Sequence, residues 1–177
     1  ESWFEITPFD KIEKEKLYET ERGTNSALNG IYLDLANDAL YGLDLSGGMV
    51  EVLAQHYVMP DAHSYYRLSN FDYGYESSWK KLDETWKNAY RVIANCNEFL
   101  YEVGQREEDY ETEKYRMYCG EALALRTLLH FDMLRLFGPV YATSPEQYSV
   151  PYYTLSTNVA RPMLTAEALL DSLLRDI

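Results

Sequence analysis

Two long amphipathic patterns joined by a short polar connection constrain the fold of this chain more than any other feature of its sequence. Across residues 79–104, and again across 110–137, apolar side chains return at the spacing of one helical face. The polar residues 105–108 connect the two patterns, and a connection this short makes neighbouring helices run antiparallel. The sequence therefore predicts a long antiparallel helical hairpin.

Glycines mark the predicted ends of both hairpin helices. Gly104 stands at the position after a helix that often adopts a left-handed backbone conformation. The pair Gly138 and Pro139 ends the second pattern sharply, because proline cannot continue a helix. We therefore expect the first helix to end at Gly104 and the second to end before Gly138.

Shorter helical patterns flank the hairpin on both sides. Residues 20–43 carry one apolar face at helical spacing, and a short amphipathic piece follows at 49–56. A last helix begins near Thr165, whose hydroxyl is the predicted N-cap. The apolar pattern of that helix is still running at Ile177. We therefore expect a C-terminal part to be missing and interpret 1–177 as one truncated helical domain.

Three stretches show no persistent period. Residues 1–19 are interpreted as an extended arm that leads into a helix, and 57–78 and 139–163 as irregular loops rich in turn residues. A loop as long as 57–78 inside a compact domain is usually functional or mobile. The predicted fold class is all-α, with antiparallel helix pairs and long irregular loops.

The charge of the chain excludes several classes of partner. Its formal net charge is -13 at pH 7, with 29 acidic against 16 basic side chains. Nucleic-acid binding needs clustered Lys and Arg against the phosphates, and docking on an anionic membrane needs the same. No apolar run approaches the roughly 18 residues that a membrane-spanning helix requires. We therefore expect neither nucleic acid nor the lipid surface itself as a partner.

The polar clusters lack the pattern of a catalytic or metal centre. His56 and His63 flank Asp61 without a third ligand at motif spacing, which favours a polar loop over a zinc site. His130 lies one helical turn after Arg126 with no nucleophile at hand, so we interpret it as a structural histidine. We expect no metal, no cofactor and no enzymatic activity.

Charged residues on the second hairpin helix are interpreted as partly buried pairs between helices. The alternative is that they hold the neighbouring loops in place. They are Glu121, Arg126, Asp132 and Arg135.

The two cysteines, Cys96 and Cys119, fall at similar heights on the predicted hairpin. Packed helix axes lie about 8–10 Å apart, whereas a disulfide needs Cα atoms within about 7 Å. Two buried thiols are therefore expected, and a disulfide requires that both side chains point inward.

Aromatic side chains crowd into the loop at 57–78 and the residue that follows it. Tyrosine dominates the aromatic content, with 17 Tyr against 6 Phe and 3 Trp, and its apolar face and polar tip suit a recognition surface. Sugars present apolar faces and hydroxyls together, which aromatic rings beside Asn, Asp and Arg can satisfy. The alternative is that these aromatics only pin a long loop to the helices. The predicted ligand-binding residues are Tyr65, Tyr66, Arg67, Asn70, Asp72, Tyr73 and Trp79.

Several short motifs follow one another in a characteristic order along the chain. The first hairpin helix carries Trp86-Lys-Asn-Ala-Tyr90, and the second carries Gly120-Glu-Ala-Leu-Ala-Leu-Arg126 and then Leu134-Arg-Leu-Phe-Gly-Pro139. The segment Val150-Pro-Tyr-Tyr-Thr154 comes after them. In this order and spacing they resemble the SusD/RagB-like proteins of gut Bacteroidetes, and the resemblance runs across nearly the whole chain.

The resemblance implies an outer-membrane lipoprotein that faces the outside of the cell and captures glycans or other nutrients, with peptides as the ligand of some members. The family has an all-α fold with tetratricopeptide-like helix pairs, does no chemistry, and delivers its ligand to a SusC-like TonB-dependent transporter. Its membrane attachment is a lipid on an N-terminal cysteine that is absent from this chain. Members are much longer, their ligand sites draw partly on C-terminal loops, and no ligand residue carries over by motif.

Two rival interpretations remain open. One is a generic tetratricopeptide-like module that binds other proteins, and the other is a fragment of an enzyme. A lipidation motif just ahead of Glu1 would separate the surface lipoprotein from the protein-binding module. Hydrolysis of polysaccharides would favour the enzyme.

Overall fold

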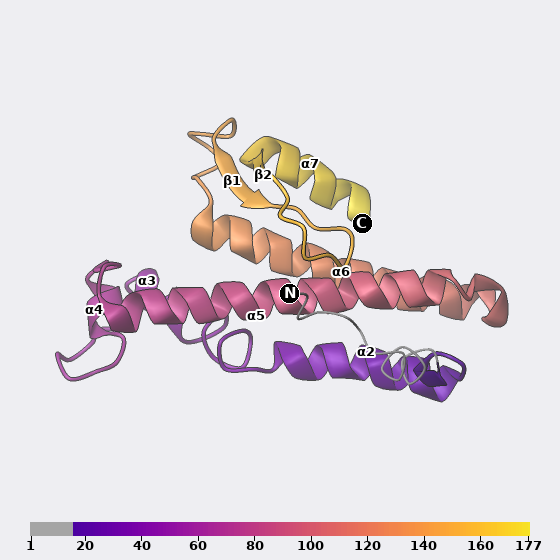
Figure 1. Ribbon diagram of the computed structural model, residues 1–177. Coiled ribbons are helices and arrows are strands. Elements are labelled where there is room, and N and C mark those ends of the chain that lie inside the picture. Colours follow the sequence, from indigo (N-terminus) through magenta and orange to yellow (C-terminus); the bar gives the residue numbers. More distant parts are fainter. Residues whose placement is uncertain (1–15) are drawn as a thin grey trace, which may run out of the picture.

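Two long helices, α5 (Glu76–Gly104) and α6 (Thr112–Phe137), run antiparallel through the centre of the computed structural model (Figure 1). The structure describes residues 16–177. The predicted helical hairpin is confirmed, although α5 begins three residues earlier and α6 two residues later than expected. The arm predicted for 1–19 falls almost entirely outside the described residues.

The facing sides of α5 and α6 form the main core. Along each helix the fully buried side chains recur every three or four residues, which is the period of one helical face. Burial of one large apolar side chain stabilises a fold by about 1.5–3 kcal/mol. This shared core therefore holds the hairpin together. Its completely buried members include Ala89, Ile93, Cys96, Tyr118, Ala122, Leu129 and Met133.

The predicted ends at Gly104 and before Gly138 are both confirmed, but the left-handed conformation expected at Gly104 is wrong. Gly104 is the last residue of α5, and its C-cap Gln105 keeps a right-handed helical conformation (φ -69°, ψ -14°). The chain continues into a short 3₁₀ turn, η1 (Glu107–Asp109), so a left-handed residue is not needed to reverse its direction. Gly138 caps α6, and a Cβ atom there would meet the Leu134 carbonyl oxygen at 2.6 Å.

The first described helix, α2 (Glu21–Leu35), packs against α5 and is shorter than the predicted 20–43. Its N-terminus is capped by the Thr20 hydroxyl, which accepts a hydrogen bond from the Gly23 amide at 3.1 Å. After Leu35 the Asn37 side chain accepts from the Ala39 amide at 2.9 Å. Asparagine competes in this way with helical backbone bonds, which explains why the helix gives way to turns.

A second, smaller core lies where α5 begins. The helix α3 (Met49–Leu53) confirms most of the piece predicted at 49–56, and α4 (Tyr66–Ser69) lies within the segment predicted as a loop. Both helices lie beside the start of α5 in Figure 1. The buried side chains of this second core are Met49, Val52, Tyr65 and Leu68.

The prediction of an irregular 139–163 is wrong in part, because a small antiparallel sheet interrupts it. Strand β1 (Tyr148–Pro151) pairs with β2 (Met163–Thr165), and β2 leads directly into α7 (Ala166–Asp176). The sheet and α7 lie against α6, whereas α2 lies against α5 (Figure 1). The helical fold class is confirmed, with this one addition.

The predicted N-cap of α7 is confirmed. The Thr165 hydroxyl accepts a hydrogen bond from the Ala168 amide at 3.2 Å. We expect Thr165→Ala to lower the free energy of unfolding by about 1 kcal/mol, because one amide of the first turn loses its acceptor. Urea denaturation measures this, with the exposed Thr154→Ala as the control. Equal stability of the two variants would contradict the role of the cap.

Both cysteines are free thiols, as predicted, but the expectation that both are buried is wrong for Cys119. Cys96 is completely buried in the core, and Cys119 is partly exposed. Burial raises the pKa of the Cys96 thiol to about 12, so this group stays protonated and unreactive at neutral pH.

In the part of the chain that the structure describes, no helix is long and apolar enough to cross a membrane.

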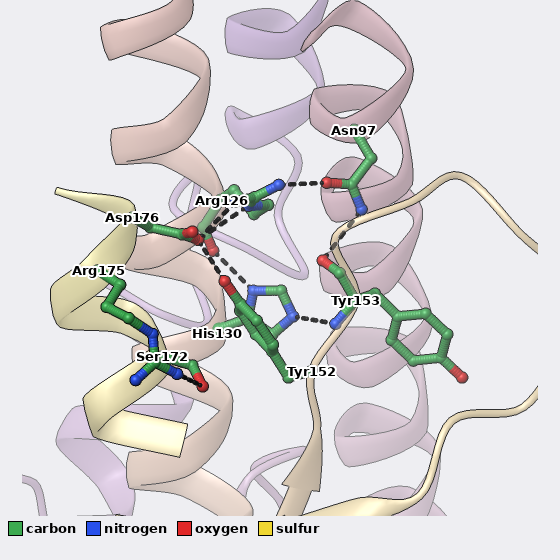
Figure 2. Close-up of polar contacts among 8 residues, drawn as sticks. All are labelled: Asn97, Arg126, His130, Tyr152, Tyr153, Ser172, Arg175 and Asp176. Atoms are coloured by element: carbon green, nitrogen blue, oxygen red, sulfur yellow. Dashed lines mark hydrogen bonds and ion pairs between the residues drawn. The ribbon is translucent and has the colours of Figure 1, made fainter. Parts of the chain in front are cut away.

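A buried polar network joins α5, α6 and α7 (Figure 2). The Arg126 guanidinium donates from Nη1 to Asn97 Oδ1 at 2.9 Å, and its Nη2 lies 2.7 Å from Asp176 Oδ2. The Tyr152 hydroxyl donates to the same carboxylate oxygen at 2.7 Å. Arg126 therefore connects elements across the core, as predicted for the charged residues of α6.

His130 ties the segment after β1 to α6, as Figure 2 shows. Its Nδ1 lies 3.0 Å from the Arg126 carbonyl oxygen, and its Nε2 lies 3.1 Å from the Tyr153 amide nitrogen. The amide can only donate, so Nε2 accepts and the Nδ1 proton goes to the carbonyl. The interpretation of His130 as a structural histidine is confirmed.

Candidate ligand-binding site

The predicted aromatic segment lies at the end of the molecule where α5 begins, next to α3 and α4 (Figure 1). A short turn of helix, α4, divides it, and its last member, Trp79, belongs to the first turn of α5. The structure divides the seven predicted ligand-binding residues among a buried anchor, an exposed stacked cluster, one wall of a cavity and the surface of α5.

Tyr65 is the buried anchor. Its side chain is only 7% exposed, and its hydroxyl donates to Asp44 Oδ1 at 2.5 Å. Burial raises the pKa of this hydroxyl, and the Asp44 carboxylate raises it further, so the phenol remains a donor. The Lys81 ammonium lies 4.4 Å from the centre of the Tyr65 ring. These contacts fasten the segment to the body of the protein, the role that the alternative interpretation gave to its aromatics.

The exposed cluster is arranged around Arg67. Its guanidinium carbon lies 4.3 Å from the Tyr75 ring centre and 5.9 Å from that of Tyr66. Its Nη1 lies 3.7 Å from Asp72 Oδ2, and the Asn70 side-chain Nδ2 donates to the Tyr66 carbonyl at 2.7 Å. The predicted polar groups therefore lie together, and their contacts within the loop hold its shape.

Tyr73 faces a cavity of about 260 Å³, which is close to the lower size of small-ligand sites. Phe71 stands beside it, with the two ring centres 6.4 Å apart at an interplanar angle of 62°. Both side chains are about half exposed, so their rings remain accessible to a ligand. Apolar residues from the preceding segments and α6 line the rest of this cavity, together with one acid and one base. They are Leu45, Val50, Leu53, Leu136, Asp132 and Arg135.

Phe71 occupies a backbone conformation that aromatic residues rarely adopt. Its φ is 56°, in the left-handed region, and its amide donates to the Leu68 carbonyl at 2.9 Å. Such a conformation costs on the order of 1–3 kcal/mol and tends to occur where a side chain must point in a particular direction. Here the direction is into the cavity, because Phe71 is one of its lining residues.

The charged groups of the cavity are held in place by their neighbours. Asp132 accepts a hydrogen bond from Arg135 Nη1 at 2.9 Å on one oxygen and from the Tyr41 hydroxyl at 2.6 Å on the other. Each carboxylate oxygen has two lone pairs, so both can accept one more hydrogen bond. The Arg135 side chain is largely exposed and keeps further donors. The site thus offers rings, carboxylate acceptors and guanidinium donors together.

Of the residues that line this cavity, only Tyr73 is among those predicted from the sequence, and its aromatic and charged partners were missed. Phe71 lay within the aromatic crowd but was not among the predicted ligand residues, because its unusual φ leaves no mark in the sequence. The sequence favoured pairs between helices for Asp132 and Arg135, but they pair with each other within α6, and Asp132 also holds Tyr41 of the segment after α2, as the alternative expected. Trp79 is about half exposed on α5 but does not line the cavity.

The arrangement suits the binding of a small polar ligand. Across residues 16–177 there is no group of three or more His, Cys, Asp or Glu side chains that could hold a metal ion. His56 contacts Glu51 and His63 stacks on Tyr65, so the two histidines join separate local contacts. A cavity lined by rings and fixed polar groups can orient a small polar ligand with apolar faces.

Comparison with known proteins shows which family of proteins this chain resembles. Residues 49–170 match the SusD-like_3 family, described as starch-binding and associating with the outer membrane. The chain is 28% identical to SusD-like protein P38 of Formosa agariphila over 182 residues, covering all of this chain and 33% of that protein. Its structure is similar to a SusD superfamily protein from Bacteroides fragilis, with a TM-score of 0.75, 22% identity and coverage of 90% of this chain and 38% of the other. The chain therefore spans about a third of the length of each relative.

Proposed function

Because this chain belongs to the SusD-like family, we propose that it is part of a cell-surface protein that captures glycans and delivers them to an outer-membrane transporter. The family is described as starch-binding and outer-membrane associated. The delivery step, the extracellular position and a lipid anchor at the N-terminus are parts of the proposal. A SusC-like TonB-dependent transporter is the proposed partner.

The cavity at Phe71 and Tyr73 carries this proposal. A sugar ring has an apolar face that can lie on an aromatic side chain, and hydroxyl groups around its rim that need hydrogen-bond partners. The two rings supply the first contact, while Asp132 and Arg135 supply acceptors and donors a short distance away. The strained backbone at Phe71 supports a binding role, because it holds one of these rings at the cavity.

The protein is proposed to bind its ligand without changing it. The carboxylate of Asp132 already accepts hydrogen bonds from Tyr41 and Arg135, which hold it in a position where its free lone pairs can accept from a ligand hydroxyl. The polar groups of the cavity can therefore orient hydroxyls, which is sufficient for capture and delivery.

Affinity electrophoresis tests the site. The protein is run through gels that contain soluble starch or one of a panel of other neutral and acidic polysaccharides, and retention is measured. We expect Phe71→Ala and Tyr73→Ala each to weaken binding of the retained polysaccharide about ten-fold, as for the loss of roughly 1.4 kcal/mol of ring contact. Tyr141→Ala is the matched control, because Tyr141 is 48% exposed and Tyr73 is 49% exposed.

The possible outcomes distinguish an error in the location of the site from an error in the proposed function. Unchanged retention in the Phe71, Tyr73, Tyr66 and Trp79 alanine variants would place the site elsewhere on the protein. Absence of retention on every polysaccharide would contradict glycan capture itself and favour the protein-binding alternative. Release of shortened oligosaccharides would favour an enzyme.

A further inference from the structure

A second cavity, of about 280 Å³, lies between the middle of α5 and the segment that follows β1. It is separate from the cavity at Phe71, because the two share no lining residue. Half of its lining comes from α5 and half from residues 151–157. The eight residues are Trp86, Tyr90, Ile93, Ala94, Pro151, Tyr153, Leu155 and Thr157.

Three aromatic rings give this second cavity its shape. The Trp86 and Tyr90 rings lie 4.8 Å apart, and the Tyr153 ring meets Tyr90 edge-on at 5.7 Å. Phe137 supports Trp86 from α6, with ring centres 5.0 Å apart. Rings that are packed against one another cannot turn freely, so the aromatic surface is formed before a ligand arrives.

Side chains of α5 and α6 hold the wall opposite α5 through hydrogen bonds to its backbone. The Tyr90 hydroxyl donates to the Pro151 carbonyl at 2.9 Å, and Asn97 Nδ2 donates to the Tyr153 carbonyl at 3.0 Å. The Tyr153 amide donates to His130, as described above. Figure 2 shows that the Tyr153 ring points away from this polar network. The network therefore fixes the backbone of Tyr153 and leaves its ring free to line the cavity.

Two hydroxyl groups of the lining are positioned as donors. The Tyr153 hydroxyl accepts a hydrogen bond from the Arg161 amide at 3.1 Å, and the Thr157 hydroxyl accepts from the Val159 amide at 3.1 Å. A hydroxyl that accepts from a backbone amide still has its own hydrogen to donate. Among the contacts of residues 16–177, neither hydroxyl donates to another protein group.

The side chains that line this cavity are all uncharged. A charged ligand would lose its hydration here without gaining an ion pair, which strongly disfavours it. A large flexible ligand is disfavoured too, because the volume is close to the lower size of small-ligand sites. Aromatic surface and two hydroxyl donors remain, and they complement the apolar face and the ring or hydroxyl oxygens of one sugar.

We propose that this second cavity is a binding site for a single neutral sugar ring, stacked on the α5 aromatics and held by hydrogen bonds from Tyr153 and Thr157. The choice of a sugar rests on the proposed function, whereas the uncharged, ring-lined geometry does not. A glycan that binds in this second cavity is therefore held at a point separate from the cavity at Phe71.

Indole N–H resonances give a direct test. Methyl glycosides of glucose, galactose, mannose and xylose are titrated separately into the ¹⁵N-labelled protein, and the indole signals of Trp79 and Trp86 are followed. We expect a saturable shift of the Trp86 signal with at least one of these sugars. Thr157→Val and Tyr153→Phe each remove one donor and are expected to weaken that binding about five-fold. Thr154→Val is the matched control, because Thr154 is exposed in the same segment and does not line the cavity.

Either of two results overturns the proposal. One is a Trp86 signal that stays in place with all four glycosides at concentrations on the order of 100 mM. The other is equal affinity in the Thr157→Val and Thr154→Val variants. Phe71→Ala combined with Tyr73→Ala is expected to leave the Trp86 titration unchanged. Loss of polysaccharide retention in that variant, together with a normal Trp86 titration, separates the two sites.

Discussion

Replacement of Arg126 by alanine is expected to lower the free energy of unfolding by about 3–5 kcal/mol, the range for breaking a buried ion pair by removing one partner. The Arg126 side chain is only 6% exposed and the Asp176 side chain 13%. Without the guanidinium, the Tyr152 hydroxyl is the one hydrogen-bond donor that residues 16–177 leave to the Asp176 carboxylate, and the Asn97 side-chain carbonyl oxygen loses its donor. Both groups would then be desolvated without full compensation.

Urea denaturation followed by circular dichroism measures the effect of Arg126→Ala. Arg91→Ala is the matched control, because Arg91 forms an exposed ion pair with Asp34 at 3.5 Å. Exposed pairs contribute about 0–1 kcal/mol, so this variant should remain close to the unmodified protein. The double change Arg126→Met with Asp176→Asn should recover part of the loss, since it removes both charges. A similar small effect of both single arginine variants would contradict the importance of the network.

Acidification is expected to destabilise the protein through His130. Burial lowers the pKa of its imidazole from the ordinary 6.5 to about 4, and the Arg126 charge also lowers it. The Arg126 carbonyl and the Asp176 carboxylate act in the opposite direction, while the Tyr90 and Tyr152 rings lie against the imidazole. In the fold, Nε2 accepts from the Tyr153 amide, so a proton there would break that hydrogen bond.

The direction follows from proton linkage. As the pH falls through 6.5, the unfolded chain takes up a proton at this histidine, whereas the folded protein does so only near pH 4. The contribution of neutral His130 is therefore complete above about pH 6.5 and is lost progressively as the pH falls to about 4. This difference between the pKa of His130 in the unfolded chain and in the fold corresponds to roughly 3 kcal/mol of unfolding free energy.

Unfolding free energies measured between pH 7 and pH 4 test this dependence. Carboxylates titrate in the same window, so the informative quantity is the difference between the unmodified protein and His130→Gln. We expect this difference to shrink as the pH falls, because glutamine takes up no proton. His63→Gln is the control, since His63 lies exposed in the aromatic segment. A constant difference between the unmodified protein and His130→Gln would contradict the assignment.

The helical hairpin was predictable because its evidence is local and repeated. Apolar side chains at helical spacing persist over more than twenty residues in both α5 and α6, and proline after Gly138 cannot continue a helix. The N-cap at Thr165 was predictable for the same reason, because one hydroxyl and a nearby amide make the contact. Short elements such as α4, β1 and β2 were missed, since three or four residues do not establish a period.

The candidate site was predictable only as a region. The aromatic composition of 57–79 identified a segment with recognition chemistry, and Tyr73 from that set does line the cavity. The set could not be divided further, because burial of Tyr65 depends on Asp44 and the cavity needs Asp132 and Arg135 from α6. These partners are far from the segment in the sequence, and local patterns carry no information about such contacts.

By itself, the sequence determined the pairing of α5 with α6 and the cap of α7, both of which depend on local patterns of residues a few positions apart. Tertiary structure alone decided which aromatics are anchors and which face a cavity. It also brought Pro151, Tyr153 and Thr157 against α5 through Asn97 and His130. The physical reason is that local spacing sets helices, whereas burial and hydrogen-bond partners are set by elements that meet only after folding.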